Sequence, residues 1–349
     1  MSKKAAQPKY RRLLISIGIS VAMAATGMMT IEAITPAVAA DKLAIPLARL
    51  CVFIGMGLAV AQVIESRGWT RRLGAVAAPL FSYANLGTRC SAAFSAAFFS
   101  GVAANSMLVD FYNDNKITRK QMFLTNFINQ LPAYFLHLPT TFFIVVPLTK
   151  TAGLIYFALT LTATLVRTMV FVIWGRLFVP PAAGQEDQEL ALQQSEAEKK
   201  GAWTVLKKRL PGRFAAILTY VVPIYTAVYF AAGLGAFEVL RTWMTRAVTL
   251  QALPVEAFSV VILSFVAEFT SGFAAAGALL DQGVITVKQT VIALIAGNII
   301  AFPVRALRHQ LPRYMGIFQP KTGAQLLLLG QFFRVASLAA VTAIYYILA

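Results

Sequence analysis

Two arginines lie within long apolar runs of this chain, and their charge makes them the first candidates for binding chemistry. Arg167 is well inside the run 152–178, and Arg334 is well inside the run 323–347. A charged side chain at bilayer depth is costly and usually faces the protein interior, where it binds a substrate or pairs with another charge. Glu268 lies in a further apolar stretch. The pattern therefore predicts an anion site that uses both arginines, a gate formed by an arginine and Glu268 as a further candidate substrate-binding residue, or a structural pairing of an arginine with Glu268 or backbone carbonyls.

Amide side chains gather shortly before two prolines. Proline lacks a backbone N–H, so it frees the carbonyl four residues earlier in a helix. Freed carbonyls and amides bind substrates or ions at the broken helices of transporters, but amides also hydrogen-bond neighbouring helices within bilayers. Both interpretations stay open. The candidates are Asn126, Asn129 and Gln130 before Pro132, Asn298 before Pro303, and Asn105 farther upstream.

The chain also carries one short pattern twice. Ser-Gly-x-Ala-Ala begins at Ser100-Gly101 and again at Ser271-Gly272, and each copy is followed by Ile-Thr-x-Lys-Gln. Small residues allow helices to pack closely, whereas backbone N–H groups at a hairpin tip could bind an anion. Because many transporters consist of two repeats around a midplane site, the repetition favours a two-repeat membrane protein.

Composition places the chain in a membrane. Of its 349 residues, 58% are hydrophobic and 13% are charged, well below the charged share of soluble domains. The net charge is +17, but lysine and arginine cluster between apolar runs as the positive-inside rule expects, so nucleic acid is excluded as a partner. The cysteines and histidines lack disulfide or metal-ligand spacing, and no phosphate loop or nucleophile–base pair is recognisable. We therefore expect no enzyme activity, no cofactor and no metal.

The charged segments also predict a topology for the first half. A signal-anchor helix at about 13–31 follows a basic, cytoplasmic N-terminus, and a second helix covers about 43–65. Residues 73–110 form either a full crossing or a re-entrant hairpin. Two helices follow, the first broken by proline, with a turn at Lys150 between them. The even number of crossings required between two basic cytoplasmic segments favours the hairpin.

The second half follows the same logic and predicts inverted repeats. Its expected elements are a helix at 213–234, an interfacial segment at 237–250, a second hairpin at 251–280, a proline-broken helix at 289–304 and a last helix at 323–347. The whole chain is then an all-α polytopic membrane protein with about seven transmembrane helices and two re-entrant hairpins. The expected divisions are the N-terminal segment 1–42, a first repeat at 43–178, a cytoplasmic charged linker at 179–211 and a second repeat at 212–349.

At the repeated patterns the sequence resembles the nucleoside-recognition, or Gate-domain, families. These include the concentrative nucleoside transporters, the membrane part of the bacterial ferrous-iron transporter and the spore maturation membrane proteins. The resemblance covers about 65–178 and 215–347. It implies that the matching segments 85–132 and 253–303 form a core of hairpins and broken helices.

These observations together predict secondary transport of a small polar or anionic solute by alternating access. Arg167 and Arg334 would supply charge, and Asn126, Asn129 and Asn298 would orient the solute. The alternative is a non-transporting membrane subunit or scaffold that binds a partner protein. The expected partners are the lipid bilayer of the inner (plasma) membrane, the solute, a coupling ion, and a second copy or a partner membrane subunit.

Overall fold

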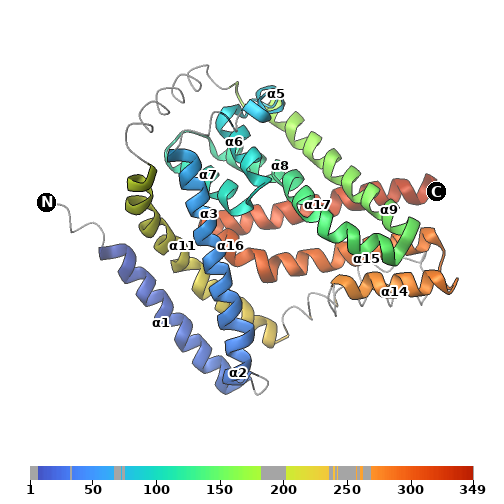
Figure 1. Cartoon of the computed structure of the whole chain (residues 1–349), viewed down its shortest axis with the longest axis horizontal. Coiled ribbons are helices and arrows are strands. Elements are labelled where there is room, and N and C mark those ends of the chain that lie inside the picture. The colour runs from blue at the N-terminus through green and yellow to red at the C-terminus, as the bar shows by residue number, and fades with distance from the viewer. Residues whose placement is uncertain are drawn as a thin grey trace. The chain divides into compact units, whose positions relative to one another are not determined.

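All regular structure in the described part of the chain is helical, so the expected all-α class is confirmed. The computed structural model describes residues 7–31, 34–66, 72, 75–181, 202–235, 239, 242, 257, 260–261 and 269–348. Six helical segments within these residues are long and apolar enough to cross a bilayer, which needs about 20 residues. They are Tyr10–Thr30, Pro36–Ile64, Thr141–Phe178, Leu210–Gly233, Val287–Phe318 and Pro320–Leu348. The chain is therefore a multi-pass helical membrane protein (Figure 1).

Some predicted features fall outside the described residues. They are Glu268, residues 182–201 of the linker 179–211, nearly all of the interfacial segment 237–250, and the first part of the second hairpin 251–280, up to residue 268 except for 257, 260 and 261. The described residues belong to two compact units. Unit 1 comprises Met1–Ala133, Val170–Gly235 and Arg308–Leu327, and unit 2 comprises Tyr134–Met169, Ala236–Leu307 and Leu328–Ala349. Each unit groups residues that contact one another. This grouping does not test the repeat boundaries expected from the sequence, which stay a prediction.

α11 (Ala202–Gly233) is the central helix of unit 1. The helices that pack against it are α1 (Gln7–Thr30), α3 (Ile45–Ser66) and α16 (Leu311–Phe318). Small residues let these helices approach closely. Gly27 of α1 faces the ring of Phe230, and Gly316 of α16 faces Val221. The N-terminal helix is thus an integral part of unit 1, lying along α11 in Figure 1.

The second membrane-spanning segment begins earlier than the sequence predicted. Thr35 caps α2 (Pro36–Ala39), and its side chain accepts a hydrogen bond from the Val38 N–H at 3.3 Å. Threonine suits this position because its side-chain oxygen satisfies a free N–H of the first turn. A π-helical turn, η1 (Ala40–Ala44), then leads into α3. These short pieces extend the span back to Pro36.

Four short helices of unit 1 pack on one another and cover the region of the first predicted hairpin. They are α5 (Ala78–Tyr83), α6 (Gly87–Ala97), α7 (Gly101–Asn113) and α8 (Arg119–Ile128). Asn85, with a φ angle of 57°, lies between α5 and α6, and Gly87, with a φ angle of 81°, is the first residue of α6. α6 and α7 pack against each other across a short turn that ends at Ser100. This is the local structure of a helical hairpin.

α9 (Gln130–Phe178) folds back on itself at Lys150, which confirms the predicted turn. Lys150 has φ 51° and ψ −127°, a conformation that costs roughly 1–3 kcal/mol for a residue other than glycine. The two arms lie side by side, since the rings of Phe142 and Phe157 are 5.4 Å apart between centroids. The arms correspond to the two helices expected on either side of Lys150.

Unit 2 is built around α15 (Val287–Arg305). α14 (Phe269–Asp281) lies beside it, joined by a turn at Gly283, whose φ is 69°. Buried apolar side chains from α9, α14 and α15 form one core. Its most deeply buried members include Val145, Ala276, Val291, Ile295 and Ile300. An ion pair between Lys150 and Asp281, 2.7 Å from Nζ to Oδ1, connects the turn of α9 to the end of α14.

The repeated Ile-Thr-x-Lys-Gln pattern starts a helix in both copies. Thr118 caps α8 and Thr286 caps α15, and each accepts a hydrogen bond from the N–H of the glutamine three residues later. The glutamine side chain in turn accepts one from the threonine N–H, which makes a capping box. The preceding Ile117 and Ile285 are buried. The sequence repeat therefore encodes the same local structure twice.

α15 does not break at Pro303, contrary to the prediction. The helix continues to Arg305 and then widens into the π-helical turn η2 (Ala306–Gln310) before α16. A proline removes one N–H and pushes against the preceding turn, and a wider turn can absorb that distortion without ending the helix. α8, in contrast, ends at Ile128, four residues before Pro132.

Gly277 of α14 provides a test of the packing in unit 2. A Cβ atom at Gly277 would meet the backbone carbonyl of Leu148, so Gly277→Ala should destabilise the protein by about 1–3 kcal/mol through overpacking. At Gly101 nothing lies within 4 Å of the Cβ position, so Gly101→Ala should be neutral or stabilising. Thermal unfolding in detergent compares the two variants, and equal melting temperatures would contradict the close contact.

Candidate functional site

Arg167 and Arg334 both belong to unit 2, where their guanidinium groups lie within electrostatic range of each other. Arg167, on the second arm of α9, is 7% exposed and donates from Nη1 to the Ser337 hydroxyl at 2.8 Å. Ser337 lies one turn after Arg334 on α17 (Pro320–Leu348) and donates to the Arg334 carbonyl at 3.0 Å. The structure thus brings together the two arginines that occupy matching places in the sequence.

Phe302 provides an aromatic platform for the guanidinium groups. The Cζ atom of Arg334 lies 3.2 Å from the centroid of the Phe302 ring, and that of Arg305 lies 5.2 Å from it. A cation over the face of a ring is stabilised by the ring quadrupole. Stacking uses the face of the planar guanidinium, so its N–H donors remain directed outward in the plane. α15 therefore supplies both a support for Arg334 and a third arginine.

Asn298 lies one turn before Phe302 and therefore on the same face of α15. It is 6% exposed, and its Nδ2 donates to the hydroxyl of Tyr156, itself buried. Its Oδ1 is buried without a hydrogen-bond partner among the described residues. Tyr156 also lies within electrostatic range of Arg334 and Arg305. An amide acceptor thus accompanies the arginines in one region of unit 2.

Arg167 and Arg334 have no carboxylate partner among the described residues. Arg167 and Arg334 form no ion pair there, and the Nε of Arg167 has no hydrogen-bond partner among them. Asp281, the described acidic residue of unit 2, pairs with Lys150 instead. Guanidinium groups with available N–H donors bind carboxylates and phosphates. We call this group of side chains the arginine cluster: Arg167, Arg305, Arg334, Phe302, Asn298 and Tyr156.

The amides predicted in the first repeat lie in unit 1 and differ in environment. Asn126 donates from Nδ2 to Asn105 Oδ1 at 2.9 Å, and both side chains are buried. This bond ties α8 to α7 and supports the structural interpretation for that pair. Asn129 is 7% exposed, and neither polar atom of its side chain has a partner among the described residues. Gln130, beside it, is half-buried.

The repeated Ser-Gly pairs do not share one role. Ser100 is the N-cap of α7 and accepts a hydrogen bond from the Ala103 N–H at 3.2 Å. Gly101 is exposed with open space around it, so close helix packing does not explain this glycine. In the second copy Gly272 is buried within α14, and the side chain of Ser271 is outside the described part.

Sequence reasoning missed Tyr156, Phe302 and Ser337 as members or supports of the arginine cluster. Helical spacing could have indicated two of them, because Phe302 is four residues after Asn298 and Ser337 is three after Arg334. Tyr156 carries no such signal. It reaches Asn298 because α9 folds back at Lys150.

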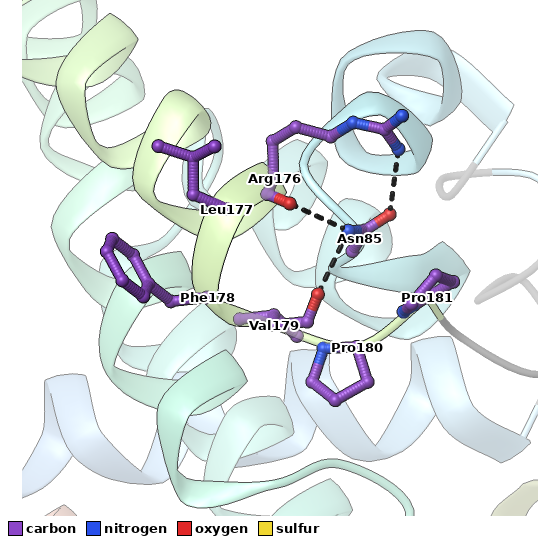
Figure 2. Close-up of a pocket in the computed structure, with 7 residues that line it drawn as sticks. All are labelled: Asn85, Arg176, Leu177, Phe178, Val179, Pro180 and Pro181. Carbon is purple, nitrogen blue, oxygen red and sulfur yellow. Dashed lines mark hydrogen bonds between the residues drawn. The ribbon is translucent and has the colours of Figure 1, made fainter.

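A separate pocket lies in unit 1 at the end of α9 (Figure 2). The Asn85 Nδ2 donates to the carbonyls of Arg176 and Val179 at 3.2 and 2.9 Å, and its Oδ1 accepts from Arg176 Nη1 at 3.4 Å. The other residues that line the pocket are Leu177, Phe178, Pro180 and Pro181. Because these bonds satisfy carbonyls left free at a helix end, Asn85 acts as a structural cap.

The fold and the arginine cluster describe a multi-pass helical membrane protein with an internal cationic region. Three proteins of Methanocaldococcus jannaschii are similar to the chain along most of their length. The uncharacterized protein MJ0880 is 24% identical over 291 residues, which cover 78% of this chain and 88% of MJ0880. The uncharacterized protein MJ0871 is 22% identical over 303 residues, which cover 86% of this chain and 94% of MJ0871. The uncharacterized protein MJ1556 is 24% identical over 300 residues, which cover 84% of this chain and 91% of MJ1556. No protein-family model and no solved structure matches the chain.

The capping role of Asn85 can be tested by comparison with Asn115, which also has a positive φ angle. Asn85→Gly keeps the backbone conformation available but removes the bonds to the end of α9. We expect a loss of about 1–3 kcal/mol, since each bond contributes roughly 0.5–1.5 kcal/mol. Asn115, with φ 56°, is exposed, so Asn115→Gly should change stability little. Thermal unfolding of both variants gives the comparison, and equal behaviour would remove the capping role.

Proposed function

We propose that the chain is a secondary transporter that moves a small polar or anionic solute by alternating access. The observation that carries the proposal is Arg167, a buried guanidinium with an N–H donor that no described residue accepts, next to Arg334. A charge within a protein interior costs several kcal/mol unless it is paired. A bound anion supplies that pairing during transport.

The proposed architecture has about seven transmembrane helices, with the two arms of α9 counted separately, and two re-entrant hairpins. α6 and α7 would form the first hairpin and residues 251–280 the second, in inverted repeats like those of Gate-domain proteins. The capping boxes at Thr118 and Thr286 support equivalent repeats. The positive-inside rule favours a cytoplasmic N-terminus in the inner (plasma) membrane.

Transport would be driven by a gradient rather than by nucleotide hydrolysis, since the sequence has no phosphate-binding loop. Asn129 lies where α8 ends and α9 begins, and its buried amide has no partner in the described part of the chain. Such breaks expose backbone carbonyls and amides that bind solutes or coupling ions. Asn129 is therefore our candidate in unit 1 for binding a coupling ion.

Removal of either guanidinium group should weaken anion binding. For Arg167→Gln and Arg334→Gln we expect affinity to fall about 10–100-fold, because a hydrogen bond to a charged group contributes roughly 1.5–3 kcal/mol. The purified protein in detergent is screened by thermal shift with nucleosides, dicarboxylates, phosphate-bearing metabolites and inorganic anions. A ligand that binds the native state raises its stability, by about 2.7 kcal/mol at roughly 100 times Kd. Uptake of any anion that binds is then measured in proteoliposomes.

The matched control is Arg49→Gln, which removes an exposed arginine from α3 and should leave binding unchanged.

A double-mutant cycle with Glu268→Gln separates binding from structural pairing. If Arg167 or Arg334 pairs with Glu268, the single variants lose stability and the double variant loses no more than either. That result, together with no ligand shift in the native protein, would overturn the transport proposal.

One surface favours the second candidate, a membrane subunit that binds another helix. Gly18, Ala22 and Ala25 lie on one exposed face of α1, and nothing lies within 4 Å of the Cβ position of Gly18. Small residues at this spacing let two transmembrane helices associate closely. The opposite face of α1, with Gly27, already packs on α11. The exposed face therefore fits a second copy of the chain or a partner membrane subunit.

Gly18→Leu should disrupt such association, because a bulky side chain keeps helix backbones apart. We expect the particle mass in detergent, measured by light scattering, to fall to that of a single chain. Ile15→Leu, at another exposed position of α1, conserves volume and should have no effect. A native protein that is already a single chain would exclude this face as a homo-oligomer contact.

A further inference from the structure

The arginine cluster contains one feature that anion binding alone does not use. Asn298 is buried, and with its Nδ2 engaged by the Tyr156 hydroxyl, its Oδ1 remains without a partner among the described residues. A buried acceptor without a donor destabilises the protein. Within the arginine cluster, Asn298 thus resembles Arg167 in having a buried polar atom without a hydrogen-bond partner among the described residues.

The two open groups differ in chemistry. Arg167 Nε is a donor, and the guanidinium of Arg334 also presents donors. Asn298 Oδ1 is an acceptor and needs a hydrogen-bond donor. A fully ionised inorganic anion or a plain carboxylate has no donor to offer, so it satisfies the arginines and leaves Asn298 unpaired.

The charge around Asn298 restricts the kind of donor. Arg305 and Arg334 lie within electrostatic range of its partner Tyr156. An ammonium donor in this region would be repelled by the guanidinium of Arg334, because both carry a positive charge. A hydroxyl group donates without adding charge.

Helix geometry restricts the size of the ligand. Asn298 and Phe302 are four residues apart on α15, which corresponds to about 6 Å along the helix at 1.5 Å per residue. Arg334 stacks on Phe302, so the residue that carries the acceptor and the residue that supports the guanidinium lie one helical turn apart on α15. A short carbon chain of a few atoms suffices to place an acidic group at Arg334 and a hydroxyl at Asn298.

We infer that the arginine cluster selects short hydroxylated organic anions, with Asn298 as the residue that determines specificity. This inference rests on the proposed function and names the substrate class of the same site. Arg167 and Arg334 bind the acidic group of the ligand. Tyr156 holds the Asn298 amide so that its oxygen accepts from the ligand hydroxyl.

The test compares anions that differ by a single hydroxyl group. Isothermal titration calorimetry with the full-length protein in detergent measures Kd for malate against succinate, lactate against propionate, and glycerol 3-phosphate against propyl phosphate. We expect the hydroxylated member of at least one pair to bind ten-fold or more tightly. In Asn298→Leu, which is similar in volume but cannot accept, the ratio should fall to about one while the affinity for the other member stays unchanged.

Tyr156→Phe keeps Asn298 but removes its partner, so it should reduce the preference without removing anion binding. Thermal unfolding verifies that both variants fold. Equal affinities within every pair that binds would overturn the hydroxyl inference and leave the transport proposal standing. A preference that persists in Asn298→Leu would overturn the role of Asn298. Absence of binding by every anion would overturn the proposed function and this inference together.

Discussion

The burial of guanidinium charge is the constraint on which the interior of unit 2 depends. The helices around Arg167 and Arg334 are apolar, and in such surroundings each charge costs several kcal/mol unless other groups solvate it. The structure supplies partial solvation from neutral groups: the Ser337 hydroxyl bonds Arg167, and the Phe302 ring supports Arg334. These contacts reduce the cost without neutralising the charge. They also place both guanidinium groups where an anion could pair with them.

A second constraint acts on the backbone. At membrane depth a free N–H or carbonyl must be satisfied by the protein or by enclosed water, so each break between short helices requires a specific side chain. Thr118 and Thr286 satisfy helix starts, and Asn85 satisfies carbonyls at the end of α9. The same positions that the sequence marks as interruptions are therefore the positions where polar side chains are engaged locally.

Local features could be predicted from the sequence because their causes are local. The turn at Lys150, the helix starts after Ile117 and Ile285 and the apolar spans follow from short patterns and hydropathy. The uninterrupted course of α15 through Pro303 could not, since it depends on a π-helical turn that absorbs the proline. The full composition of the arginine cluster could not be predicted either. Tyr156 reaches Asn298, 142 residues away, only through tertiary packing.

The arrangement of hydrogen bonds supports the proposed binding role of the arginines. A structural arginine is most stable when all its donors are satisfied, and a buried ion pair can often be replaced by apolar residues with no loss of stability. Arg167 instead keeps an unsatisfied Nε, and Asn298 an unsatisfied Oδ1, among the described residues. Each costs about 1–3 kcal/mol, and buried unsatisfied polar groups are rare enough in native proteins that each needs an explanation. Open donors and an open acceptor in one buried region are the pattern expected of a site whose ligand completes the bonding.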